Sequence, residues 1–155
     1  MQIWLDADGC PRAVTDHVLR TAIRRNIPVI RIANRPIAPH LSPLVKAVCV
    51  GAGFNVADAY IAEHVGAGDL VITSDVPLAA QVVAKGAVGL SPRGDPFTED
   101  NVGAKLAMRD LMHDLRAAGE VRGGPPSPGP AEHRRFADAL DRLLTRLNQR
   151  PATGS

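Results

Sequence analysis

Residues 3–9, Ile-Trp-Leu-Asp-Ala-Asp-Gly, are a short apolar run that ends in two acidic residues and a glycine. Such a run is typical of a buried strand that leaves the core at a turn. Pro11 follows, and proline suits the first position of a helix. Apolar residues then recur every four positions from Val14 to Ala22, which predicts a helix with one buried face. The chain therefore begins with a strand–turn–helix unit.

The same alternation of strand and helix continues along the chain. Strands are predicted at 29–33, 45–50, 69–73 and 88–90, and helices at 55–65, 77–84 and 99–118, the last capped by Thr98. Residues 91–97 are expected to form a loop. Alternating strands and helices specify a parallel sheet with right-handed crossovers. We therefore expect a three-layer α/β fold, in which helices cover both faces of a mostly parallel sheet of four to five strands.

The length and composition suit one domain with one core. The chain has 155 residues, of which 45% are hydrophobic but only 3% aromatic, so aliphatic side chains must fill the core, as in buried parallel sheets. Residues 1–118 are expected to form the α/β domain and residues 119–130 a semi-rigid Gly/Pro linker. Residues 131–149 are expected to form a helix whose apolar stripe packs back on the domain, and residues 150–155 a disordered tail.

Bulk properties exclude several classes of protein. The net charge of +2 is too small to predict a nucleic-acid partner by itself. Cys10 and Cys49 are not spaced as a metal-binding pair. The N-terminus does not resemble a signal peptide, and no run approaches the roughly 20 apolar residues that a membrane span needs. We therefore expect a cytoplasmic protein without a membrane partner, and the oligomeric state stays open.

Acidic residues follow the predicted strands. Asp6 and Asp8 follow the first strand, Asp75 follows strand 69–73, and Asp58 lies in the first turn of the helix that leads into that strand. Ligands of parallel sheets bind beyond the carboxyl ends of the strands, near a reversal of strand order. If the first and fourth strands are neighbours, the four carboxylates converge there, and like charges at close range require a cation.

Mg²⁺ or Mn²⁺ suits such a set of hard oxygen ligands. An ion of this kind can polarise a phosphoryl oxygen and activate water for attack. A basic group must then hold the substrate phosphate, and Arg93, in the loop after the fifth strand, is the best-placed candidate. The sequence thus predicts a metal site that binds phosphate esters.

Each acid also has a structural explanation. Asp8 suits a turn, Asp58 is favoured by the helix dipole with Asn55 as cap, and Asp75 is a preferred N-cap type. Asp6 differs, because an acid that ends an apolar strand directly before another acid is poor for stability. Four coincidences at one sheet edge are less plausible than one site.

Other polar residues are expected to be structural. Asp69 begins its strand, so it is expected at the opposite edge of the sheet as a turn acid. Cys10 is expected to be a small buried thiol, since no histidine is placed to activate it. Arg109 and Asp110 are expected to form a solvated ion pair.

Residues 3–11, Ile-Trp-Leu-Asp-Ala-Asp-Gly-Cys-Pro, resemble the N-terminal signature of the YaiI/YqxD family of bacterial proteins. Further segments resemble that family in order: 52–58, 68–75, 77–79, 92–94, 108–110, 123–125 and 136–144. The family is regarded as biochemically uncharacterised and is similar to the PIN-like nuclease superfamily, which has a parallel sheet and an acidic Mg²⁺ or Mn²⁺ site. The resemblance implies catalytic and metal-ligating roles for Asp6, Asp8, Asp58 and Asp75, with Ser74 as an accessory group beside the substrate phosphate.

Two positions depart from the family pattern. Gly9 stands where the family usually has alanine, which is a mild change. Asn55 stands where an aspartate is expected, and the loss of that carboxylate weakens the case for a second metal ion.

Three functions follow from these features. The first is a metal-dependent phosphodiesterase that acts on nucleic acid, RNA more than DNA. The second is a phosphatase of the haloacid dehalogenase type, in which Asp6 is the nucleophile, Asp8 the acid and Lys85 an accessory cation, although the expected acid pair after residues 88–90 is missing. The third is a non-catalytic RNA-binding or regulatory module, against which the mixed charge and the few aromatic residues count.

Overall fold

A computed structural model describes residues 1–53, 55–120 and 128–149 of the chain. Its elements, in order, are β1 (Ile3–Asp6), α1 (Arg12–Arg25), β2 (Val29–Ala33), β3 (Val45–Cys49), α2 (Val56–His64), β4 (Leu70–Ile72), α3 (Val76–Ala84), β5 (Val88–Leu90), β6 (Pro96–Phe97), α4 (Val102–Ala117) and α5 (Pro130–Gln149). Most of the predicted linker, with the segment 123–125, and the predicted tail at 150–155 lie outside the described residues.

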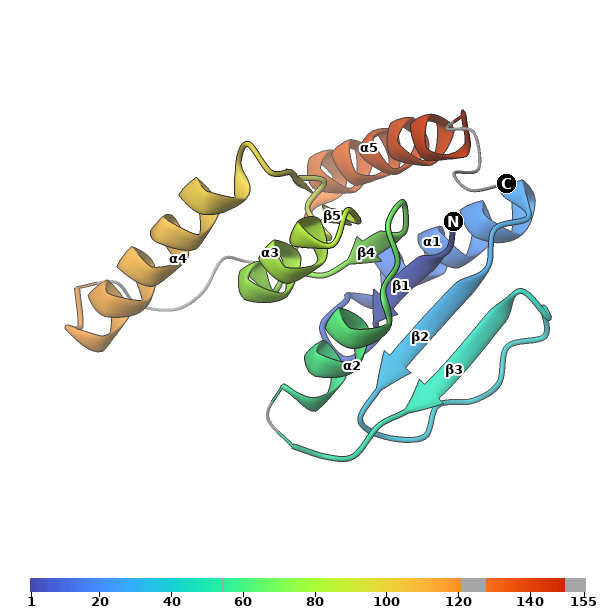
Figure 1. Ribbon diagram of the computed structural model, residues 1–155, viewed down its shortest axis with the longest axis horizontal. Helices are drawn as coiled ribbons and strands as arrows, with labels where there is room; N and C mark the ends of the chain where they lie inside the picture. Colours follow the sequence, from blue (N-terminus) through green and yellow to red (C-terminus); the bar gives the residue numbers. More distant parts are fainter. Residues whose placement is uncertain (54, 121–127, 150–155) are drawn as a thin grey trace.

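The six strands form one sheet in the order β3-β2-β1-β4-β5-β6 (Figure 1). All neighbours are parallel except β5 and β6, where Leu90 lies opposite Pro96 in an antiparallel pair. The predicted α/β fold with a mostly parallel sheet is confirmed. The prediction of four to five strands is wrong, since the sheet has six, and so is the prediction of a loop throughout 91–97. The sequence does not reveal β6, because a two-residue strand that starts with proline shows no alternation of apolar and polar residues. Proline is tolerated there because β6 lies at the edge of the sheet.

Successive residues of a strand face opposite sides of the sheet, and the core follows this rule. Ile3 and Leu5 of β1 pack with α1 and α5, whereas Trp4, between them, packs with Ile61 of α2 and Leu78 of α3. Two apolar layers therefore sandwich the sheet, and the prediction of helices on both faces is confirmed (Figure 1).

The start of α4 shows how a side chain can decide where a helix begins. Helix α4 begins at Val102, so the prediction of a helix from about residue 99 capped by Thr98 is wrong. The Asn101 side chain accepts a hydrogen bond from the Thr98 N–H at 2.9 Å and donates one to the Pro96 carbonyl at 2.9 Å. These bonds hold residues 98–101 in a turn before the helix.

Helix α5 returns to the domain and closes the core on the α1 side. Its residues Phe136, Leu140 and Leu144 are fully buried, beside Val14 and Val18 of α1. The backbone of α5 passes close to Gly94, where φ is +92° and a Cβ would lie 2.7 Å from the Phe136 nitrogen. Only glycine therefore fits at this contact.

Two ion pairs attach the start of α5 to the loop between β5 and β6. Arg93 Nη1 lies 2.8 Å from Glu132 Oε2, and Arg135 pairs with Asp95.

Within the part of the chain that the structure describes, no helix is long and apolar enough to cross a membrane.

Leu144→Ala should destabilise the fold by about 2–5 kcal/mol, because it leaves a cavity where α5 meets the sheet. Urea unfolding would measure this loss, with Arg142→Ala as the matched control. Arg142 is exposed on the same helix, so its truncation should change the free energy of unfolding by no more than about 0.5 kcal/mol. Equal effects of the two substitutions would mean that α5 does not pack as described.

Candidate functional site

Strand order reverses between β1 and β4. The chain passes from β1 outward through β2 and β3 and then returns to place β4 on the other side of β1. A reversal of this kind leaves a crevice beyond the carboxyl ends of the two central strands. Asp6 is the last residue of β1, and Ser74 and Asp75 follow β4. The predicted convergence of the acids required β1 and β4 to be neighbours, and this pairing is confirmed.

Asp6 lies in the centre of this crevice. Burial raises the pKa of its carboxyl group, the negative charge of Asp8 raises it further, and Asp75 adds a smaller effect in the same direction. Hydrogen bonds from the backbone N–H groups of Gly9 and Asp8 act in the opposite direction. A cation beside Asp6 would offset the cost of this partly buried charge.

Asp58, in the first turn of α2, faces the other two acids. Burial, followed by the charges of Asp75 and then Asp6, raises its pKa to about 6. Asp6, Asp58 and Asp75 thus come from three separate elements and interact with one another; we call them the carboxylate cluster.

Asp75 has two roles at once. Its Oδ1 accepts a hydrogen bond from the Leu78 N–H at 2.8 Å and so caps α3, as its residue type predicts. Its own N–H donates to Thr73 Oγ1 at 3.0 Å. One carboxylate oxygen is therefore occupied by the cap, and Oδ2 is the oxygen left to serve the cluster.

Asp8 is turned toward the loop after β2. Its Oδ2 accepts a hydrogen bond from the Asn34 N–H at 2.9 Å, and Arg35 Nε lies 3.9 Å from Oδ1. It still lines the same hollow of about 230 Å³ as Asp6, Asp58 and Asn55. Asn55 occupies the N-cap position of α2, as expected, but in a left-handed conformation and without a side-chain cap hydrogen bond.

Arg93 and Ser74 line a separate groove next to the cluster. The Arg93 guanidinium is already paired with Glu132, so much of its charge serves the attachment of α5. Ser74 is directly beside Asp75 and is solvent-exposed. Of the two predicted phosphate-binding residues, Ser74 is thus the one that borders the cluster.

Among the described residues, no group of three or more His, Cys, Asp or Glu side chains is arranged as a ready metal site. Mg²⁺ commonly binds through one or two carboxylates, several waters and substrate phosphates, rather than in a cage of protein ligands. The carboxylate cluster fits this second kind of site: its donors are all hard oxygens, and its members disfavour one another's charge. One or two of its carboxylates, Asp6 and Asp58 among them, could hold such an ion together with bound water.

Asp69, which was expected to be structural, lies away from the carboxylate cluster. Asp69 is buried at the opposite sheet edge, where its Oδ2 accepts hydrogen bonds from Trp4 Nε1 at 3.0 Å and the Gly66 N–H at 2.9 Å. Burial, with a smaller contribution from Asp6, raises the pKa of the Cys10 thiol to about 12, so Cys10 is no nucleophile near neutral pH.

Two charged side chains outside the cluster also find structural partners. Lys85 Nζ donates to the Ala62 and Glu63 carbonyls at 2.7 and 3.1 Å, which places this cation at the C-terminal end of α2 and away from Asp6. Arg109 forms the expected exposed ion pair with Asp110 at 3.0 Å.

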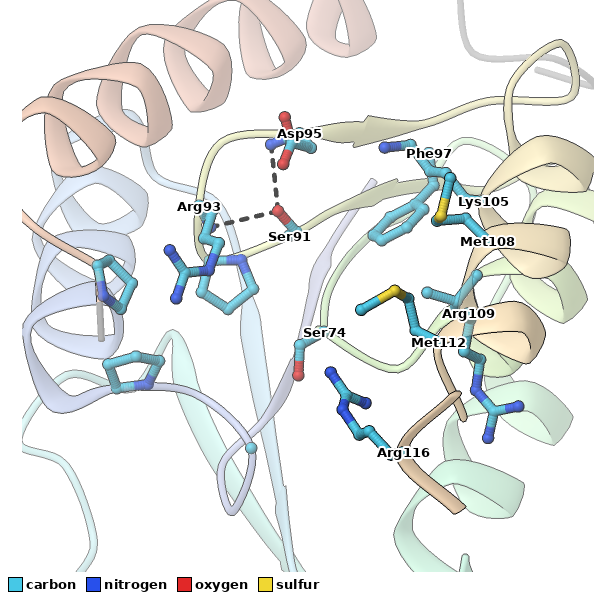
Figure 2. Close-up of a pocket in the computed structure, with 15 residues that line it drawn as sticks. Ser74, Ser91, Arg93, Asp95, Phe97, Lys105, Met108, Arg109, Met112 and Arg116 are labelled. Carbon is cyan, nitrogen blue, oxygen red and sulfur yellow. Dashed lines mark hydrogen bonds between the residues drawn. The ribbon is translucent and has the colours of Figure 1, made fainter. Parts of the chain in front are cut away.

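The groove beside the cluster was not predicted. It has a volume of about 680 Å³ and lies between α4 and the strand edge, with Phe97, Met108, Met112 and Arg116 among its lining residues (Figure 2). The spacing of Met108, Met112 and Arg116, four residues apart, places them on one face of a helix. This spacing is visible in the sequence, but the sequence does not show which part of the protein lies opposite this face of the helix.

Asp58→Asn should stabilise the metal-free protein. At pH 7.5 Asp58 is ionised, since this pH lies above its pKa of about 6, and its charge repels Asp75 and Asp6. Removing roughly 1 kcal/mol of such repulsion, a value already reduced for solvent screening, should raise the melting temperature in EDTA by about 2–4 °C. Asp138→Asn, at an exposed acid of α5, is the control and should leave the melting temperature unchanged.

The advantage of Asp58→Asn should depend on pH. Because the folded-state pKa of Asp58 is raised from 3.8 to about 6, ionisation of this group costs stability progressively as pH rises through that window. The melting temperatures of variant and wild type should therefore nearly coincide at pH 4 and separate fully above about pH 6.5. The same separation at pH 4 and pH 7.5 would contradict the repulsion described here.

The comparisons with known proteins agree on one family. The family model described as "Uncharacterized BCR, YaiI/YqxD family" matches residues 4–146. A UPF0178 protein of Trichlorobacter lovleyi is 54% identical over 147 residues, which cover 95% of this chain and 96% of the relative. A UPF0178 protein of Geobacter sulfurreducens is 52% identical over 151 residues, covering 97% of this chain and 100% of the relative. No solved structure matches. The chain therefore belongs to the YaiI/YqxD family.

Proposed function

We propose that this protein is a divalent-metal-dependent phosphodiesterase that hydrolyses nucleic acid, RNA in preference to DNA. The observation that carries the proposal is the convergence of Asp6, Asp58 and Asp75 at the point where strand order reverses. The preference for RNA comes from the resemblance to PIN-like nucleases and not from the geometry of the site.

The properties of the cluster support metal-assisted hydrolysis. Mg²⁺ or Mn²⁺ bound there would polarise a phosphoryl oxygen and lower the pKa of a bound water. Asp6 and Asp58 would hold the ion, and Asp75, whose charge acts on both, would hold a metal-bound water from the α3 side. Asp8, fixed by the Asn34 N–H, would serve from the rim of the hollow as an acceptor for ordered water.

The surroundings of Asp8 and Lys85 favour this function over a phosphatase with an Asp6 nucleophile. In the phosphatase, Asp8 would have to donate a proton to the leaving group, but its Oδ2 accepts a hydrogen bond from the Asn34 N–H and its Oδ1 lies 3.9 Å from Arg35 Nε, so both oxygens face other partners. The Lys85 ammonium is bound at the end of α2 and cannot neutralise a phosphate at Asp6 without leaving both of its partners.

Cleavage of single-stranded RNA with Mn²⁺ should depend on the cluster. Asp6→Asn and Asp75→Asn should each lower the rate by about 100-fold or more, because several kcal/mol of charge stabilisation are lost. Asparagine can still cap α3, so Asp75→Asn should remain folded. Asp138→Asn, outside the cluster, should cleave like the wild type.

Four results would contradict the proposal. Equal cleavage by all variants would indicate a contaminating nuclease or another site. Calorimetry that detects no uptake of Mn²⁺ at millimolar concentration would remove the metal. Covalent phosphorylation of Asp6 after incubation with a small phosphate monoester would favour the phosphatase, and metal-independent RNA binding without cleavage would favour the non-catalytic module.

A further inference from the structure

Helix α4 carries apolar side chains, yet among the helices that the structure describes it is the one with no buried residue. It packs against α3 and stands away from the rest of the domain (Figure 1). Met108 and Leu111 are 57% and 51% exposed. The fold does not need this apolar face for its core, which makes the space in front of the helix a candidate for ligand binding.

That space is the groove of about 680 Å³ between α4 and the edge formed by β5, β6 and the loop between them. Figure 2 shows Met112 of α4 at the groove with Met108 above it, and Phe97 of β6, which is only 4% exposed, beside them. Methionine side chains are flexible and pack well on aromatic rings. The interior of the groove is therefore suited to a flat, apolar or aromatic group.

Four positively charged side chains line this groove, Arg93, Lys105, Arg109 and Arg116, together with one acid, Asp95. Lys105 lies 5.5 Å from the centre of the Phe97 ring, and Arg116 points toward Ser74 at the other end of the groove (Figure 2). Arg93 and Arg109 have carboxylate partners, whereas no ion pair is recorded for Arg116 among the described residues. Arg116 is thus the guanidinium best able to bind an anionic group of a ligand.

The groove adjoins the carboxylate cluster. Gly9 lines both the groove and the hollow that contains Asp6 and Asp58. It has no side chain to separate the two spaces, and a Cβ at this position would lie 2.9 Å from Asp6 Oδ2. A ligand that fills the groove and extends past Gly9 and Ser74 would bring its next linkage to the acids.

We propose that the groove binds one unpaired nucleotide of a nucleic-acid strand, whose base packs on Met108 and Met112 of α4 and whose phosphate pairs with Arg116. This inference rests on the proposed phosphodiesterase function and adds the form of the substrate. The volume suits a ligand of nucleotide size, and a base offers its flat face to the groove only when it is not stacked in a duplex.

Binding without cleavage tests this proposal separately from catalysis. Fluorescence anisotropy of a labelled eight-nucleotide single-stranded RNA would be measured in EDTA for wild type, Met112→Asp, Met112→Leu and Arg116→Ala. Met112→Asp and Arg116→Ala should each weaken binding by about 10-fold or more, and Met112→Leu should bind like the wild type. Arg142→Ala, at an exposed arginine on α5, should change binding by less than about twofold.

Competition experiments distinguish an unpaired nucleotide within a strand from a free nucleotide or a duplex. An excess of blunt-ended duplex RNA should not displace the labelled strand, and AMP should displace it only at much higher concentration than unlabelled strand does. Tighter binding of AMP or of duplex than of the single strand would overturn the proposal, as would equal affinity of all variants or no binding of the strand. If Asp6→Asn abolishes cleavage while Met112→Asp leaves binding unchanged, the phosphodiesterase stands and the groove proposal fails. If Met112→Asp weakens binding while Asp6→Asn leaves cleavage unchanged, the groove binds the strand and the proposed phosphodiesterase site fails.

Discussion

The pairing of β1 with β4 is the constraint on which the other features of the site depend. It places Leu5 beside Ile72, and so Asp6 and the Ser74–Asp75 turn leave the sheet side by side. The same pairing puts the reversal of strand order at this edge, which opens a crevice that neither α1 nor α3 can cover, since each helix begins there. Asp58 enters the crevice from α2, which crosses between the two halves of the sheet.

The carboxylate cluster combines structural and chemical roles in the same groups. Asp75 stabilises the start of α3 through one oxygen, as an N-cap does in many proteins. Burial is the larger cause that raises the pKa of Asp58 to about 6, and the charge of Asp75 is the next. A structural reason for an acid therefore does not argue against a functional one. The cap holds Asp75 at a fixed distance from Asp58 and Asp6, and repulsion within the cluster is the cost of this arrangement.

The last two helices differ although both are amphipathic. The apolar stripe of α5 fits against β1 and α1, and the Arg93–Glu132 and Arg135–Asp95 ion pairs set its position. None of the apolar residues of α4 is buried, and Met108 and Met112 line the groove. Burial of a helical stripe depends on whether a complementary surface lies within reach, and a periodic pattern in the sequence does not contain that information.

The sequence by itself determined the α/β class, the parallel sheet and the four acids at its carboxyl edge, because alternation, chain direction and residues directly after strands are local properties. It also distinguished Asp69, at the opposite edge, from Asp6 and Asp75. The tertiary structure alone decided that Asp8 turns to Asn34, that Arg93 is paired with Glu132, that Pro96 and Phe97 add a sixth strand, and that α4 faces a groove beside Gly9. Each of these contacts joins residues that no periodicity relates, and their energies depend on distances that only the packed chain defines.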